Sequence, residues 1–111
     1  MKKTLTLLCA AIILMPAIAS AKPGIFKKFQ ATYPNSQLPG KMGCMLCHED
    51  TDSYNRNPYG MEVEKTLATN GGAPNFAAIE ALDSDGDSFT NIEEINANTA
   101  PGDKNDHPAS H

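Results

Sequence analysis

The sequence predicts an all-α fold in which one small helical domain follows an export signal. Three observations favour this fold class. Apolar side chains recur at helical spacing in several short stretches, and prolines stand at positions where helices begin. No stretch alternates apolar and polar residues over the length of a convincing β-strand. The sequence has no internal repeat, so a single domain accounts for the part that follows the signal.

Residues 1–21 are organised as a secretory signal peptide. Two lysines charge its start, an apolar run continues to Ile18, and Ala19-Ser20-Ala21 is a small-residue cleavage motif. The apolar run is shorter than the roughly 20 residues that a membrane-spanning helix needs. We therefore expect a mature chain of residues 22–111 that lies in the periplasm or outside the cell and keeps no membrane attachment.

The mature chain is short and acidic. Its 90 residues carry seven lysines and arginines, because Lys2 and Lys3 leave with the signal, against thirteen aspartates and glutamates. The resulting net charge of −6 argues against nucleic acid or an anionic membrane surface as a partner. A domain of this length has a marginal core unless a cofactor, a metal or a disulfide supports it.

The first half of the mature chain predicts two short helices. Pro23-Gly24 precedes an amphipathic stretch that Pro34-Asn35 ends. Residues 34–40 contain two prolines and a glycine and predict a loop. A second short helix is expected to open near Lys41, and the polar residues 49–57 predict turns.

The second half predicts further helices around an acidic loop. Pro58 suits the first turn of a helix that runs to about Thr69, and Asn70-Gly71-Gly72 should stop it. Pro74 is expected to open another short helix, with apolar side chains along one face at Phe76, Ile79 and Leu82. The last expected elements are the acidic loop 83–94, a helix near Asn91 to Asn98 and a loosely ordered polar tail over residues 101–111.

Cys44-Met45-Leu46-Cys47-His48 has the pattern of a c-type haem attachment site. Two thiols on one helical turn can each add to a haem vinyl group, and His48 can offer an imidazole nitrogen to the iron as the proximal ligand. Cys9 leaves with the signal, so both remaining thiols are available. A thioredoxin-like redox pair needs a βαβ context, and this sequence predicts only helices. A zinc site needs four ligands, and besides His48 the other two histidines lie at the C-terminal end. One covalent haem c is therefore the favoured interpretation.

The sixth iron ligand is left open by the sequence. Met61 follows the haem segment on the next expected helix and is the candidate, although a core methionine would look the same. His107 is the second choice, on a tail that would have to fold back. A vacant sixth position is the third alternative, and it would let O₂, CO or NO bind.

The surroundings of the haem are predicted less directly. We expect the second ring nitrogen of His48 to be fixed by a carbonyl or a carboxylate. Leu46, Tyr59, Phe76 and Ile79 are the apolar side chains that we expect against the macrocycle, with plain core packing as the alternative.

The acidic segment 83–94 fits a twelve-residue calcium loop. Alternate side chains can converge on one cation, and a glutamate at the last position can close the shell with two oxygens. Position 6 is Ser88 where glycine is usual, which costs about 1 kcal/mol if the backbone is left-handed there. A solvated acidic turn is the alternative to a structural Ca²⁺ site. The expected ligands are Asp83, Asp85, Asp87, the backbone carbonyl of Phe89, Asn91 and Glu94.

Together these motifs resemble small exported mono-haem c-type cytochromes of bacteria. The resemblance rests on the CxxCH pattern, on Asn57-Pro58-Tyr59-Gly60 shortly after it, and on an acidic segment similar to a dockerin or thrombospondin type 3 calcium repeat. It covers nearly the whole mature chain. It implies a cytochrome c-like helical domain wrapped around one covalent haem, an EF-hand-like helix-loop-helix, and electron transfer in the periplasm or outside the cell.

Three functions are compatible with the sequence. The first is a soluble electron carrier that transforms no substrate and docks, through its acidic surface, on redox proteins with a basic patch. The second is a ligand-binding or peroxidase-like haem protein with an open iron position, although no distal acid–base pair is evident. The third is a calcium-dependent interaction module that also carries haem.

Overall fold

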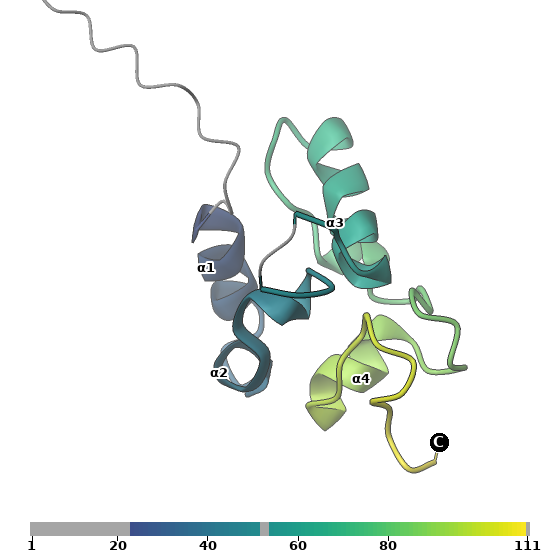
Figure 1. Ribbon diagram of the computed structural model, residues 1–111. Helices are drawn as coiled ribbons and strands as arrows, with labels where there is room; N and C mark the ends of the chain where they lie inside the picture. Colours follow the sequence, from purple (N-terminus) through teal and green to yellow (C-terminus); the bar gives the residue numbers. More distant parts are fainter. Residues whose placement is uncertain (1–22, 52–53, 111) are drawn as a thin grey trace, which may run out of the picture.

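The structure is a computed structural model that describes residues 23–51 and 54–110 (Figure 1). The expected signal peptide lies outside the described residues. The described part is mostly helical, as an all-α fold requires, and its only strand-like feature is an isolated antiparallel bridge between His48 and Arg56. Its helices and 3₁₀ turns are α1 (Pro23–Thr32), α2 (Leu38–Met42), η1 (Gly43–Leu46), α3 (Pro58–Thr69), η2 (Ala77–Ile79) and α4 (Asn91–Ala97).

A single apolar core joins all six elements. The ring of Phe29 on α1 meets Phe76 edge-on at a centroid distance of 5.4 Å and Tyr59 of α3 at 6.5 Å. Such edge-to-face aromatic contacts add specific geometry to the burial of large apolar surfaces. The remaining buried members of this core are Leu38, Leu46, Val63, Ile79 and Ile95.

Helix α3 has the bounds that the sequence predicts. The Asn57 side chain caps it by accepting a hydrogen bond from the Gly60 N–H at 2.8 Å, and Pro58 occupies the first turn. After Asn70 the backbone turns through Gly71 and Gly72, both at positive φ, which only glycine adopts without strain. The predicted start and stop signals of this helix are therefore confirmed.

Helix α4 is also confirmed, and its ends have clear local causes. Thr90 and Glu93 form a capping box, in which each side chain accepts a hydrogen bond from the other residue's backbone N–H. Asn98 ends the helix in a left-handed conformation with φ 56°. The helix therefore starts inside the acidic segment and places Glu94 on its first turn.

Two other predictions need correction. The stretch after Pro74 forms only the 3₁₀ turn η2, and Leu82 is exposed, because the backbone leaves the helical path to meet α4. The carbonyl of Leu82 accepts the Asn91 N–H at 2.7 Å, and the carbonyl of Glu80 accepts the Ile92 N–H at 3.0 Å. The segment Cys44–His48, which we call the haem motif after its expected role, was expected on the helix near Lys41. It follows α2 on a separate 3₁₀ turn, because Gly43 breaks the helix at φ 55°.

The expected loose tail is instead buried at Pro101 and Gly102 and forms hydrogen-bonded turns as far as Asp106. We call residues 99–106 the C-terminal strap. Its Ala100 is 1% exposed, and Pro101 and Gly102 are buried. The Asp106 carboxylate accepts the Ala100 N–H at 3.0 Å, and the Asp106 N–H is bonded to the Asp103 carbonyl. The strap therefore has its own turn structure, which a composition of small and polar residues does not reveal.

Figure 1 shows how these elements surround the haem motif. Helices α1 and α2 lie on one side of the chain that follows η1, α3 lies on the other, and α4 lies with the C-terminal end below them. Among the described residues, no helix is both long enough and apolar enough to span a membrane.

Candidate functional site

The two cysteines lie on the turn η1 and at its end, and both are free thiols in the described structure. Cys44 is exposed and Cys47 is half-buried, while Leu46 between them is 1% exposed and anchors the turn in the core. The carbonyl of Cys44 accepts the N–H groups of Cys47 and His48, at 3.3 and 3.0 Å. One turn thus carries both thiols and leads directly into the histidine.

The imidazole of His48 has one ring nitrogen against a backbone carbonyl. Its Nδ1 lies 3.3 Å from the carbonyl oxygen of Asn55, and the same carbonyl accepts the Glu49 N–H at 3.0 Å. When Nδ1 carries the proton and donates it to this carbonyl, Nε2 is left as a lone-pair donor. This is the contact expected of an oriented metal-binding histidine.

Asn57 holds the haem motif through its side chain and its backbone. Its side-chain Nδ2 donates to the carbonyls of Met45 and Leu46, both at 3.1 Å, and its backbone N–H donates to the Cys47 carbonyl at 2.9 Å. The same side chain caps α3 through Gly60. One buried amide therefore fixes the haem motif and the start of α3 relative to each other.

Gly60 allows α3 to approach this turn closely. A methyl group at its Cβ position would overlap the backbone carbonyl of Cys47. The sequence singled out the Asn-Pro-Tyr-Gly stretch by resemblance, but the roles of Asn57 and Gly60 as a clamp on the haem motif were missed. The signal that could have found them is an N-cap residue and a small residue within the first turn of one helix.

Burial keeps the Cys47 thiol protonated. Desolvation and the neighbouring Cys44 raise the pKa of Cys47 to about 11, and the Arg56 guanidinium only partly opposes this shift. Nucleophilic cysteines of redox enzymes have a lowered pKa. The raised pKa makes the Cys47 thiol a weak nucleophile in this structure.

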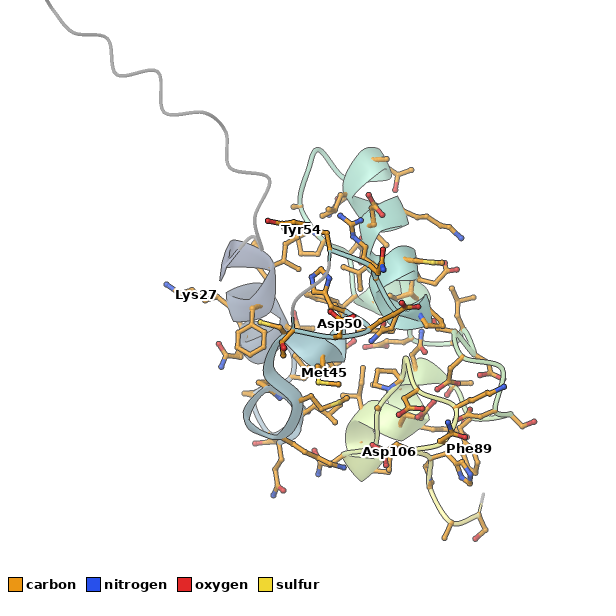
Figure 2. All side chains as sticks on the ribbon, viewed as in Figure 1. Lys27, Met45, Asp50, Tyr54, Phe89 and Asp106 are labelled. Atoms are coloured by element: carbon orange, nitrogen blue, oxygen red, sulfur yellow. The ribbon has the colours of Figure 1, made fainter. Side chains whose placement is uncertain are left out.

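The methionines around the haem motif differ in burial. Met61 is 47% exposed on the first turn of α3 and directly follows Gly60, which contacts Cys47. Met45, within the motif, is 43% exposed (Figure 2). Met42 instead packs against the apolar core. Met61 is thus available as an exposed thioether on the element that clamps the motif.

His107, the second choice for the sixth ligand, lies elsewhere. Its ring stacks on Phe89 with a centroid distance of 5.6 Å and an interplanar angle of 11°. Its Nδ1 is 2.7 Å from the carbonyl oxygen of Pro108. The structure therefore pairs His107 with the acidic loop.

The four side chains that we expected against the macrocycle belong to the protein core. Leu46, Tyr59, Phe76 and Ile79 are each at most 5% exposed and pack with Phe29 of α1. Their burial agrees with core packing, and contact of any of them with a haem stays a prediction.

The acidic segment forms a cluster of carboxylates. One ligand atom from each of Asp83, Asp85 and Asp87 lies within 4.8 Å of the other two. Asp83 organises the loop, since its carboxylate accepts the N–H groups of Gly86 and Ser88 at 2.9 and 2.8 Å. Although desolvation acts in the opposite direction, such backbone hydrogen bonds hold the pKa of Asp83 below its ordinary value. Ser88 has φ 76°, the left-handed conformation expected at this position.

Several oxygens of this cluster have no hydrogen-bond partner. They are both carboxylate oxygens of Asp85, Oδ2 of Asp87 and Oε1 of Glu94, and Glu94 is 0% exposed. Burial, followed by the charges of Asp85 and Asp87, raises the pKa of Glu94 to about 9. Burial and Asp87 likewise raise the pKa of Asp85 to about 7. Buried carboxylates of this kind need a cation or a proton as a partner.

The Asn91 side chain is bonded to the two segments that flank the acidic loop. Its amide donates to the Ile79 carbonyl at 2.9 Å and to Ser84 Oγ at 2.8 Å, and accepts the Ser84 N–H at 3.4 Å. These contacts occupy the Asn91 amide in the described structure, and its part as a cation ligand stays a prediction. As the buried first residue of α4, it ties the two ends of the loop together. The structure brings together Asp83, Asp85, Asp87 and Glu94.

Comparison with protein-family models, with curated proteins and with solved structures yields no match for this chain. The interpretation of both sites therefore depends on their own residues and geometry.

Proposed function

We propose that this protein is an exported c-type cytochrome that carries electrons one at a time and catalyses no reaction of its own. The observation that carries the proposal is the turn with Cys44 and Cys47, followed by His48 with Nδ1 against the Asn55 carbonyl. A metal-binding imidazole needs this kind of support. Two thiols on one turn beside it suit attachment at two points.

Each residue of the turn has a distinct part in this proposal. The Cys44 and Cys47 sulfurs form the thioether bonds, and His48 Nε2 binds the metal. Asn55 fixes the imidazole, while Asn57 and Gly60 hold the turn against α3. A bound haem supplies an iron ion that gains or loses one electron between its ferric and ferrous states.

We propose Met61 as the sixth ligand. It is an exposed thioether on the helix that clamps the motif, and His107 is occupied by its stack on Phe89. The alternative is an open sixth position that binds small ligands or supports peroxidase-like activity.

The proposed partners are redox proteins with a basic docking patch. The net charge of the full chain is −4, and becomes −6 once the signal is cleaved. Complementary charge speeds the encounter of two proteins, and salt weakens it. The proposed location, periplasmic or extracellular, rests on the signal-like residues 1–21.

Covalent attachment is tested on protein secreted from cells that mature c-type cytochromes. After acid–acetone extraction, the mass of the purified chain should exceed that of the bare polypeptide by one haem. Cys44→Ala and Cys47→Ala should each retain haem through one bond only and in lower yield, and the double variant should retain none. A wild-type chain with the bare polypeptide mass would contradict the proposal.

The sixth ligand is tested by adding CO to the reduced protein. With Met61 bound, CO should change the spectrum slowly and incompletely, and Met61→Ala should bind it at once. Met45→Ala is the matched control, because Met45 is equally exposed and lies in the same region. Rapid CO binding by the wild type would favour the open-position alternative.

A second proposed function is structural binding of Ca²⁺ by Asp83, Asp85, Asp87 and Glu94. It is favoured by Glu94, which is fully buried and whose Oε1 has no hydrogen-bond partner. Asp85 and Asp87 also have carboxylate oxygens without a partner. Hard cations prefer such carboxylate oxygens, and loops of this type outside the cell bind with dissociation constants of about 10⁻⁴–10⁻³ M.

Calorimetric titration with Ca²⁺ tests this site directly. Glu94→Gln should weaken binding at least about tenfold, since a closing carboxylate ligand loses its charge. Glu62→Gln removes the same charge from the surface of α3, where it pairs only with Lys65 at 3.0 Å, and should leave binding unchanged. Equal affinities in the two variants would rule out Glu94 as a ligand.

A further inference from the structure

We propose that the C-terminal strap positions the haem motif. A cation bound at the acidic loop would strengthen the contact by which the strap restrains that motif. Gly102 is the residue through which the strap reaches the motif. The inference rests on the two sites proposed above and concerns the connection between them.

The first link joins the loop to the strap. Thr99, the first residue of the strap, donates its backbone N–H to the Glu94 carbonyl at 3.0 Å. Its hydroxyl lies 3.4 Å from both that carbonyl and Oε2 of the Glu94 carboxylate. Since Oε1 of the same carboxylate has no protein partner, one side chain faces the cation site with one oxygen and the strap with the other.

The second link joins the strap to Asn57. Gly102 lies against the Asn57 side chain so closely that a methyl group on Gly102 would overlap the amide carbon, oxygen and nitrogen. Asn57 is 6% exposed, and Ala100 and Pro101 before Gly102 are buried. The strap backbone thus covers the amide and keeps it from moving away from the turn that it holds.

The third link joins Asn57 to the haem motif. The covered amide donates to the carbonyls of Met45 and Leu46, and the Asn57 backbone N–H donates to the Cys47 carbonyl. Glu94, the strap, Asn57 and the motif therefore form one continuous series of direct contacts.

A parallel connection reaches the helix before the motif. The Asn98 side chain, at the end of α4, accepts the Gln37 N–H at 2.8 Å. Lys41 of α2 donates to the Asn98 carbonyl at 3.1 Å and pairs with Asp106 of the strap at 3.4 Å. The ion pair is exposed and contributes little by itself, but the contacts hold α2 and the strap to the same helix end.

The cation matters because the carboxylates repel one another without it. The ligand atoms of Asp83, Asp85 and Asp87 lie within 4.8 Å of one another, and the charges of Asp85 and Asp87 act on Glu94 at the first turn of α4. Neutralising that charge favours the arrangement in which Glu94 and Thr99 are in contact. Loss of the cation should loosen α4 and the strap first, and through Gly102 the hold on the haem motif.

Amide hydrogen exchange on the mature secreted protein tests this connection. The reporters are the N–H groups of His48 and Asn57, which donate to the carbonyls of Cys44 and Cys47. Chelation of Ca²⁺ should speed their exchange about tenfold, as local opening becomes easier. If chelation speeds exchange only in the loop, at Gly86 and Ser88, the connection does not exist.

Two variants separate the connection from the sites that it joins. With Ca²⁺ saturating, Gly102→Ala should speed exchange at His48 and Asn57 about tenfold while the Ca²⁺ affinity stays within about twofold. Gly40→Ala is the matched control, since nothing lies within 4 Å of its Cβ position. Thr99→Val removes only the hydroxyl contact with Glu94. It should reduce the effect of chelation on the exchange rates of His48 and Asn57. This variant tests the connection even if Gly102→Ala does not fold.

The possible failures are distinguishable. A protein that binds no Ca²⁺ overturns both the cation site and the connection. Binding of Ca²⁺ with unchanged exchange at His48 and Asn57 overturns the connection alone. A purified chain without haem overturns the cytochrome proposal, whereas the exchange experiment still reports on the strap.

Discussion

Single residues with tight surroundings decide whether the proposed haem motif is held in place. Gly60 and Gly102 both stand where a Cβ would enter occupied space, against the Cys47 carbonyl and against the Asn57 amide. These glycines are needed for close approach and not for an unusual backbone conformation, since neither has a positive φ.

Gly60→Ala should destabilise the protein by about 1–3 kcal/mol, the usual range for a methyl group forced into a packed site. The neighbour is a backbone carbonyl that cannot rotate away, so the turn itself has to shift. Chemical denaturation measures the change in the free energy of unfolding, with Gly40→Ala as the control. Equal stability of both variants would show that α3 can move without cost.

The titration of Glu94 and Asp85 gives the metal-free protein an unusual pH dependence. Their pKa values rise from ordinary values of 4.5 and 3.8 to about 9 and about 7, with burial as the main cause. The folded state therefore binds more protons than the unfolded state between these limits, and the free energy of unfolding falls as the pH rises from about 4 to about 9. Denaturation of metal-free protein at several pH values should show this decline.

Saturating Ca²⁺ should remove most of the decline, because the cation replaces the protons. Metal-free Glu94→Gln should show a flatter pH dependence than the wild type, since the residue with the larger shift no longer ionises. A decline of the same size with and without Ca²⁺ would mean that the carboxylates do not share a cation.

At the scale of elements, the acidic loop depends on the helix that follows it. The capping box of Thr90 and Glu93 fixes where α4 begins, and this start places Glu94 in the cluster and the Asn91 amide behind it. Helix initiation and the proposed cation site therefore depend on the same few residues.

Thr90→Ala should cost about 1 kcal/mol of stability through the lost cap, and should also weaken Ca²⁺ binding. For a domain of this size, such a cost lowers the melting temperature by about 4–8 °C. Thr32→Ala, on the exposed end of α1, removes only a hydroxyl that donates to the Lys28 carbonyl and should change little. An unchanged Ca²⁺ affinity in Thr90→Ala would show that the helix cap does not contribute to Ca²⁺ binding.

Local signals explain which elements could be predicted from the sequence. Pro58 and Asn70-Gly71-Gly72 bracket α3, and α4 starts and ends near its predicted bounds, because caps and stops act within one turn. The stretch after Pro74 was predicted as a helix and forms only η2, because its carbonyls bond to the start of α4, a contact between segments that periodicity does not report.

The same distinction applies to the sites. The spacing of Asp83, Asp85, Asp87 and Glu94 predicted a cluster that the structure brings together, since the loop is local in sequence. The partners of the Asn91 side chain could not be predicted, because the pattern gives a position in the loop but not the contacts with Ile79 and Ser84. The contact of Gly102 with Asn57, forty-five residues apart, has no local signal at all.

For the whole molecule, the proposed sites lie at the border of the core. Aromatic and aliphatic side chains from all six elements close the core, and Leu46 anchors the haem motif in it, while polar contacts of Asn57 and Asp83 hold the rest of the motif and the acidic loop. The structure therefore has one apolar core, with the two proposed sites at its edge.

The unpartnered carboxylates around Glu94 have a consequence for when this chain can finish folding. A precursor held where free Ca²⁺ is scarce should keep its C-terminal part open, and it should close only after it reaches a compartment rich in the ion. Limited proteolysis of the full-length precursor should accordingly cleave within residues 83–106 without Ca²⁺ and be suppressed there at millimolar Ca²⁺; equal cleavage in both conditions would refute this. The acidic loop would then delay folding of the C-terminal part until Ca²⁺ binds, so that the precursor stays unfolded there during the proposed export.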